Sequence, residues 1–268
     1  MKKIICTILM LTSLVAGNAQ GRVDGFFKGQ GNLDLAISGA FEGNSKFLGN
    51  GTVHNIPRTI FAGSAFVAYG ISDKLDINVS VPYIVVNGNG GLQDGAVYLK
   101  YYLKSVKKSK SKFLDLVLAA GFSSNFTNYQ TGGASALGQQ AKQFDIRPVF
   151  QLYFPKSVFA TVQTGFTYKF DPVPNAFPLA VKVGIAKSKF YADVWYDFQH
   201  SFGGIDYPTG DSFRKLGVSY HKIGGTFYKP IKNKFGIFVG ASYTLTGRNT
   251  AQGIGINAGF VLKHNKKK

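Results

Sequence analysis

Hydrophobic and polar residues alternate along much of this chain with a period of two. In "KLDINVSV" (74–81), aliphatic residues occupy the odd positions from 75 onward and polar residues occupy the even ones. Successive side chains of a strand point to opposite faces, so this pattern predicts a strand with one apolar and one polar face. The apolar face would pack on a core in a soluble sandwich, but would contact lipid in an outer-membrane barrel.

The same alternation, bounded by turn residues, predicts about twelve strands. The strand expected at 213–228 changes phase near Gly224 and Gly225, where we expect a β-bulge. The predicted strands are 31–41, 59–70, 74–86, 95–104, 113–124, 143–154, 157–168, 179–186, 189–200, 213–228, 234–246 and 253–263.

The connections between these strands alternate in length. The odd connections are 42–58, 87–94, 125–142, 169–178, 201–212 and 247–252. The even ones are mostly shorter, at 71–74, 105–112, 155–156, 187–188 and 229–233. Outer-membrane barrels join their strands by short periplasmic turns and longer external loops. The pattern therefore predicts an all-β fold, an antiparallel transmembrane β-barrel of about 12 strands.

The N-terminus is typical of an exported protein. Lys2 and Lys3 precede an apolar run from Ile4 to Val15, and small residues follow at Gly17 and Ala19. This predicts a cleaved signal peptide at 1–19 and a barrel at 20–268, with 20–30 as a leader or a plug. The single cysteine, Cys6, falls within the signal peptide, so no disulfide is expected in the mature chain.

The chain is strongly basic, with a formal net charge of +18. Many lysines fall in or beside the short connections and at the C-terminus, which belong to one rim of the predicted barrel. Two interpretations remain open: a solvated rim, or a basic mouth that attracts anionic solutes or periplasmic partners. These lysines are at positions 74, 104, 107, 108, 110, 112, 156, 187, 189, 229, 232, 234, 263, 266, 267 and 268.

Two consecutive stretches, "YGISDKLDINVSVPYIVVNG" (69–88) and "GLQDGAVYLKYYL" (91–103), contain a Tyr-Gly turn, a Pro-Tyr pair and a Gly-x-x-Asp segment before Lys-Tyr. In this respect the chain resembles the outer-membrane barrel family associated with meta-pathway phenol degradation, described as transporters. The resemblance implies an outer-membrane barrel that passes small molecules, leaves open whether these are hydrophobic, and supplies no catalytic motif. The basic ending "GFVLKHNKKK" departs from the usual terminal aromatic residue.

If the apolar faces meet lipid, the polar faces line a lumen. Two interpretations of this charged set stand side by side: a solute pathway, with Asp145–Arg147 and Asp193–Asp197 as constrictions, or a network of paired charges that fills the barrel. The expected lumen residues are Asp76, Asn78, Ser80, Lys100, Asp115, Asp145, Arg147, Lys182, Asp193 and Asp197, together with Asp34, Gln151 and Gln163.

Catalysis and metal binding find little support in the sequence. His200 stands beside Ser201, but adjacent strand residues point to opposite faces and cannot cooperate. The four histidines do not cluster and the loop aspartates lack calcium spacing, so we expect no metal, no cofactor and no enzymatic activity.

The leading hypothesis is an outer-membrane channel or transporter for a small solute, gated or made selective by the loop at 125–142. The alternatives are a structural or surface-interaction barrel without transport, and a soluble periplasmic β-protein. We expect contact with outer-membrane lipid and dependence on the barrel-assembly machinery of a Gram-negative cell, and no contact with nucleic acid. The sequence predicts no oligomeric state.

Overall fold

The computed structural model describes residues 23–266, except 109–110, 134, 208–212 and 233. The predicted signal peptide lies outside the described residues, as do the first residues of the leader. No helix in the described part of the chain is long and apolar enough to cross a membrane.

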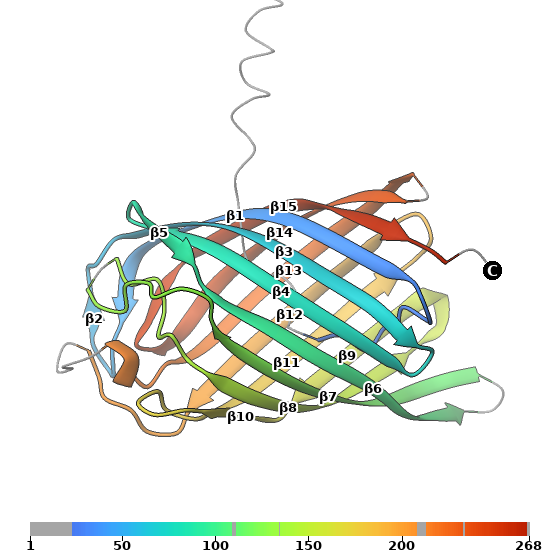
Figure 1. Ribbon diagram of the computed structural model, residues 1–268, viewed down its shortest axis with the longest axis horizontal. Helices are drawn as coiled ribbons and strands as arrows, with labels where there is room; N and C mark the ends of the chain where they lie inside the picture. The colour runs from blue at the N-terminus through green and yellow to red at the C-terminus, as the bar shows by residue number, and fades with distance from the viewer. Residues whose placement is uncertain (1–22, 109–110, 134, 208–212, 233, 267–268) are drawn as a thin grey trace, which may run out of the picture.

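Twelve antiparallel strands close into a barrel (Figure 1). The order around the wall follows the sequence, and β15 pairs with β1 to close it. One wall strand consists of two parts, β9 and β10, and the short strands β2 and β5 extend the sheet beside β1 and β4. The bounds are β1 Leu33–Leu48, β2 Val53–His54, β3 Arg58–Ser72, β4 Leu75–Val86, β5 Asn89–Leu92, β6 Asp94–Lys108, β7 Ser111–Asn125, β8 Gln143–Tyr153, β9 Val158–Thr164, β10 Phe166–Lys169, β11 Ala176–Ala186, β12 Tyr191–Ser201, β13 Ser219–Lys232, β14 Phe235–Arg248 and β15 Thr250–His264.

All twelve predicted strands are present, with differences at their ends. The strand predicted at 213–228 begins at Ser219, because residues Phe213–Lys215 form a short 3-10 helix, η2. The bulge expected at Gly224 and Gly225 is absent: the register of β13 shifts instead between His221 and Lys222 and between Pro230 and Lys232. β1 runs on to Leu48 through pairing with β15, which shortens the first external connection and leaves 126–142 and 202–218 as the two longest.

The two faces of the wall differ in chemistry. Large apolar side chains lie on the outward face, where Val194 is 66% and Ile254 is 61% exposed. Polar residues in the opposite phase are buried, and Asp76 is 0% exposed. Such an extensive apolar exterior would be unfavourable in water, and it matches the lipid-facing band of a membrane barrel. The aliphatic side of residues 74–81 belongs to this exterior.

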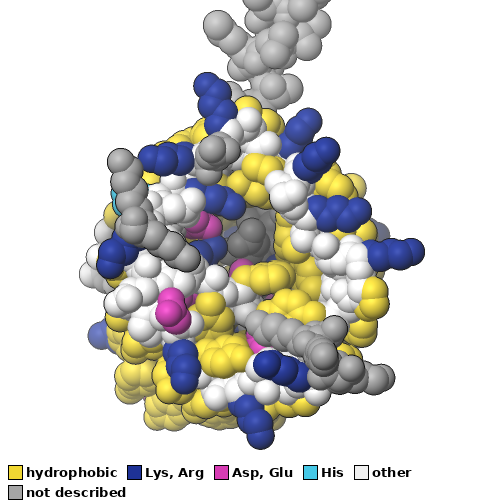
Figure 2. Space-filling view, turned by 90° about the vertical axis from the view of Figure 1, so that its right-hand side faces the viewer, with side chains coloured by type: hydrophobic (Ala, Val, Ile, Leu, Met, Phe, Trp, Pro, Cys, Tyr) yellow, Lys and Arg dark blue, Asp and Glu magenta, His cyan; other side chains and the backbone are white. Residues whose placement is uncertain are grey.

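The short connections gather at the end of the barrel where β15 finishes. Figure 2 shows this end, with lysine and arginine side chains distributed around the rim. Strand-end and turn lysines here are exposed, among them Lys74, Lys156, Lys187, Lys229 and Lys234. The basic rim expected from the sequence is thus a feature of one mouth.

Candidate functional site

The strand register determines which side chains face the lumen. Asp76 is opposite Lys100, and the same phase passes from strand to strand around the wall. This inward phase contains all the polar residues expected there from the sequence. The set is Asp76, Asn78, Ser80, Lys100, Asp115, Asp145, Arg147, Lys182, Asp193 and Asp197, as well as Asp34, Gln151 and Gln163.

An N-terminal segment, residues 23–32, lies inside the barrel and is held by Lys100. The Nζ of Lys100 lies 3.0 Å from Oδ1 of Asp24 and 3.4 Å from Oδ2 of Asp76. It also donates a hydrogen bond to the carbonyl of Phe26, and the backbone N–H of Lys28 donates to Asp76 at 3.0 Å. The side chains of Lys100 and Asp76 are 1% and 0% exposed, so this pair is shielded from water, whereas the side chain of Asp24 is 37% exposed.

The charges around Asp24 favour its ionised form. Burial alone would raise the pKa of Asp24, but the ammonium groups of Lys100, Lys28 and Lys182 outweigh it and hold that pKa below the ordinary 3.8. Lys28 in turn forms an ion pair with Asp34 at 2.5 Å. The segment is therefore anchored electrostatically along its length.

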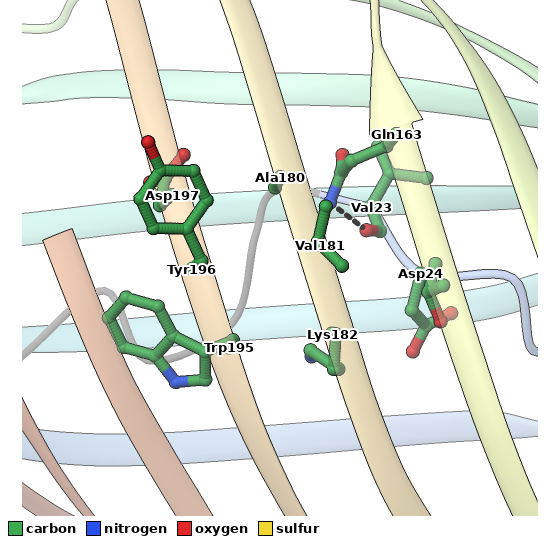
Figure 3. Close-up of a pocket in the computed structure, with 10 residues that line it drawn as sticks. Val23, Asp24, Gln163, Ala180, Val181, Lys182, Trp195, Tyr196 and Asp197 are labelled. Atoms are coloured by element: carbon green, nitrogen blue, oxygen red, sulfur yellow. Dashed lines mark hydrogen bonds between the residues drawn. The ribbon is translucent and has the colours of Figure 1, made fainter. Parts of the chain in front are cut away.

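Apolar contacts fix the inner end of the segment. The side chain of Val23 is 2% exposed, and Gln163 donates a hydrogen bond to its carbonyl at 3.0 Å (Figure 3). The ring of Phe26 meets that of Phe159 edge-on, with centroids 5.1 Å apart. The cluster around Val23 consists of Ala96, Tyr98, Val117, Ala119 and Val149.

Two glycines allow the segment to lie against the wall. A Cβ added to Gly25 would be 2.4 Å from the Cβ of Gln151, and one added to Gly70 would be 2.0 Å from the carbonyl oxygen of Gly29. The N–H of Gly31 donates to the carbonyl of Gly70 at 2.8 Å. Larger side chains at Gly25 or Gly70 would push the segment away.

A second charged group surrounds Asp145. Nη2 of Arg147 lies 3.0 Å from its Oδ1, and the hydroxyls of Tyr98 and Thr167 donate to the same carboxylate. By contrast, Asp193 binds Lys182 at 3.3 Å, whereas Asp197 accepts from Tyr220 at 3.4 Å. Asp145 and Arg147, which the sequence paired as one constriction, are therefore in contact. Asp193 and Asp197, which it paired as the other, have different partners.

A cavity of about 20 Å³ lies beside the segment, between β9, β11 and β12. It is lined by Val23, Asp24, Gln163, Lys182, Trp195 and Asp197 (Figure 3). Within the described part of the chain, Nε1 of Trp195 and Oε1 of Gln163 have no hydrogen-bond partner. The volume of the cavity suits one water molecule.

One part of the inner wall is built mainly from small residues. Inward positions of β1, β3, β14 and β15 carry glycine, alanine and serine, and the hydroxyls of Ser38 and Ser64 lie 2.8 Å apart. Glu42 of β1 forms an ion pair with Lys222 of β13, at 2.9 Å. The small positions are Ala36, Ser38, Ala40, Ala62, Ser64, Gly240, Ser242 and Gly255.

Inward aromatic rings lie against glycines that are opposite them on the neighbouring strand. A Cβ added to Gly224 would be 2.2 Å from Cζ2 of Trp195, which is directly opposite. The same arrangement joins Tyr98 to Gly121, Phe159 to Gly184 and Phe238 to Gly259. Each ring occupies the place of the missing side chain and so takes little room from the lumen.

The external loops are joined across the outer mouth. The amide of Gln139 donates to the carbonyls of Phe213, Arg214 and Leu216, and Nε of Arg214 donates back to the carbonyl of Gln139 at 3.0 Å. Thus the loop at 126–142, the predicted gate, is tied to the loop that follows β12. Within it, burial and the hydrogen bond to Asp94 raise the pKa of Tyr129.

His200 and Ser201 lie on opposite faces of β12. His200 is exposed and its ring meets that of Phe202, whereas Ser201 is buried. Among the described residues, no group of three His, Cys, Asp or Glu side chains is placed to hold a metal ion.

The sequence pattern did not reveal the contacts of the N-terminal segment or the aromatic–glycine pairs. Asp24 and Lys100 are 76 residues apart, and no local periodicity links them. One signal was available for the aromatic–glycine pairs. The aromatic residue and the glycine both lie at inward positions of neighbouring strands, so aligning the two strands in register would have placed them opposite each other.

Solved structures with the same architecture are outer-membrane proteins. No family model and no curated protein sequence matches the chain. An outer-membrane channel from Pseudomonas putida F1 is similar with a TM-score of 0.69 and 9% identity, over 94% of this chain and 100% of that one. The fold is that of an outer-membrane β-barrel.

Two porins share the outer-membrane barrel fold less closely. The NanC porin matches with a TM-score of 0.54 and 9% identity over 86% of this chain and 98% of its own. The KdgM porin matches with a TM-score of 0.52 and 6% identity over 87% of this chain and 99% of its own. At these identities the likeness concerns the outer-membrane barrel fold alone.

Proposed function

We propose that this outer-membrane barrel is a passive channel for small solutes, and that residues 23–32 restrict its lumen. The observation that carries the proposal is the pairing inside the barrel. The segment is bound to the wall by ion pairs and hydrogen bonds, while small side chains line the inward positions at the middle of β1, β3, β14 and β15. A barrel that served only to display loops would not require this division of its interior.

The solute class we propose is small and largely apolar. The small and mostly uncharged inward side chains of β1, β3, β14 and β15 support it, as does the inward ring of Phe238. The sequence resemblance to barrels associated with phenol degradation points the same way. The similar channel and porins support the transport class through their fold.

A liposome-swelling assay tests the proposal. Proteoliposomes that contain the mature chain lacking residues 20–31 should swell in small uncharged solutes. The rate of swelling should fall as the size of the solute increases. The full mature chain should swell far more slowly. The channel proposal is wrong if the shortened chain is inserted and folded, as shown by its heat-dependent migration on gels, but admits no solute.

A further inference from the structure

The lysines of the basic rim do not all point the same way. Figure 2 shows lysine and arginine side chains around this mouth. Successive residues of a strand alternate between the lipid and the lumen, so the phase of each lysine tells which of the two it faces. A rim that attracts anionic solutes needs its lysines on the inward phase, whereas a rim that binds the membrane needs them on the outward phase.

Lys229 lies on the outward phase of β13. It stands between Phe227 and Ile231, which follow it at two-residue steps in either direction and are exposed on the lipid-facing surface. On β14 it is opposite Ile237, another exposed apolar residue of the same face. Such surroundings place the methylene stem of the lysine along the apolar band and its ammonium group at the level of the lipid headgroups.

Lys187 belongs to the same patch through two aromatic rings. Its Nζ lies 5.6 Å from the centroid of the Phe190 ring. That ring stacks on the ring of Phe227, with centroids 6.1 Å apart and an angle of 19° between the planes. Two exposed ammonium groups, those of Lys187 and Lys229, therefore adjoin one pair of stacked rings.

Two further lysines face outward because the strand register shifts beside them. The register of β6 shifts before Lys104, which is then opposite the outward side chain of Leu116 on β7. The register of β13 likewise shifts before Lys232, which is opposite the outward Phe235 on β14. Without these shifts, both lysines would fall on the inward phase.

The four outward lysines, Lys104, Lys187, Lys229 and Lys232, are exposed and carry no neutralising partner. Among the described residues, no acidic side chain forms an ion pair with any of them. Unpaired positive charge at the edge of the lipid band attracts the phosphate groups of anionic lipids.

Other lysines of the same rim face the lumen and provide an internal comparison. Lys263 is opposite Asp34, and its Nζ lies 5.1 Å from the centroid of the Tyr228 ring. The stem of Lys266 lies against Gly31, since a Cβ added to that glycine would be 2.6 Å from Cδ of the lysine. These two lysines lie beside the N-terminal segment and not beside lipid.

The outward lysines are distributed around the barrel. Five wall strands separate β6 from β13 in either direction: β7, β8, β9/β10, β11 and β12 on one side, and β4, β3, β1, β15 and β14 on the other. Lys104 and Lys229 are thus on opposite sides of the mouth. A lipid leaflet surrounds the whole mouth and reaches both, whereas a protein partner would cover one side.

We propose that the outward lysines bind the phosphate groups of anionic phospholipids in the periplasmic leaflet, with the acyl chains against the stacked rings of Phe190 and Phe227. The short connections place this rim on the periplasmic side. The proposal concerns the lipid around the barrel, so it is independent of the proposed channel function.

Spin-labelled lipids measure this preference. In phosphatidylcholine bilayers that contain the mature chain, the fraction of spin-labelled phosphatidylglycerol immobilised by the protein is compared with that of spin-labelled phosphatidylcholine. We expect the unmodified chain to retain the anionic lipid about threefold more strongly. Lys187→Gln with Lys229→Gln should remove about half of this preference, since two of the four outward charges are lost.

The matched control is Lys263→Gln with Lys266→Gln, which removes the same charge from the lumen side of the same rim. This control should keep the preference of the unmodified chain, as should Lys187→Arg with Lys229→Arg. Equal retention of the two lipids by the unmodified chain would overturn the proposal. Equal effects of the two glutamine pairs would also overturn it, because the net charge of the rim and not its outward phase would then select the lipid.

Salt provides a test that needs no substitution. At about 1 M NaCl the Debye length is about 3 Å, so the preference of the unmodified chain for phosphatidylglycerol should largely disappear. A preference that persists at this salt concentration would contradict selection by the lysines. Competition for the rim by an acidic protein, with no difference between the two lipids, would assign it to a periplasmic partner instead.

Discussion

Trp195 shows how single residues shape this lumen. Its indole lies over Gly224 in place of a side chain, and it is the only tryptophan of the chain. The ring is 9% exposed, so its position depends on the space that the glycine leaves free. Interior packing of this density leaves no room for added methyl groups.

We expect Gly224→Val to destabilise the barrel by about 1–3 kcal/mol, because the new side chain displaces the indole. The fluorescence of Trp195 during urea unfolding measures this directly. The control is Gly63→Ala, where the nearest atom to an added Cβ is the Ser38 carbonyl oxygen, at 3.9 Å. Equal midpoints for the two variants would contradict the packing of Trp195 on Gly224.

Lys100 is the second decisive side chain. Lys100→Met should cost about 3–5 kcal/mol, because it leaves the carboxylates of Asp24 and Asp76 without their shared cation. Folded and heat-unfolded barrels migrate differently on gels. The destabilisation would appear as unfolding of the variant at a lower heating temperature than the unmodified chain. The exposed Lys74→Met is the control and should have no effect. Asp24→Asn in the Lys100→Met background should recover part of the stability, and failure to do so would mean that Asp24 is not held by charge.

The strands follow from the sequence more completely than the segment between them. Period-two alternation predicts each wall strand, and because it fixes the phase it also predicts that Asp145 and Arg147 share a face. It does not say which residues on a face meet: Asp193 and Asp197 also share one, yet bind Lys182 and Tyr220. Residues 23–32 have no strand pattern, and their position depends on contacts with distant strands, so the sequence offered a plug only as the less usual alternative to a simple leader.

The N-terminal segment should respond to pH through Asp24. Its pKa is lowered in the folded chain, so the stabilisation is fully present above the ordinary value of 3.8 and is lost as the pH falls through the lower folded value. We expect conductance of the mature chain to be unchanged from pH 8 to pH 5 and to rise below about pH 3.8. Asp24→Asn should conduct already at neutral pH. A conductance step between pH 5 and pH 7 would assign control to another group.

The whole molecule combines an apolar exterior, a basic rim at one mouth and loops tied together at the other. Lysine side chains surround the mouth in Figure 2, and Gln139 and Arg214 join the loops at the opposite end. Between them, the segment bound to Lys100 occupies the charged side of the lumen. A solute that crosses the barrel along its axis must pass all three features.

Single-channel conductance in a planar bilayer tests the central claim most directly. The mature chain and the same chain lacking residues 20–31 are compared, each after insertion has been verified. The account predicts that the mature chain is closed or conducts only weakly and that the shortened chain shows discrete, larger steps. Equal conductance of the two would contradict restriction by the segment, and silence of the shortened chain would contradict a channel.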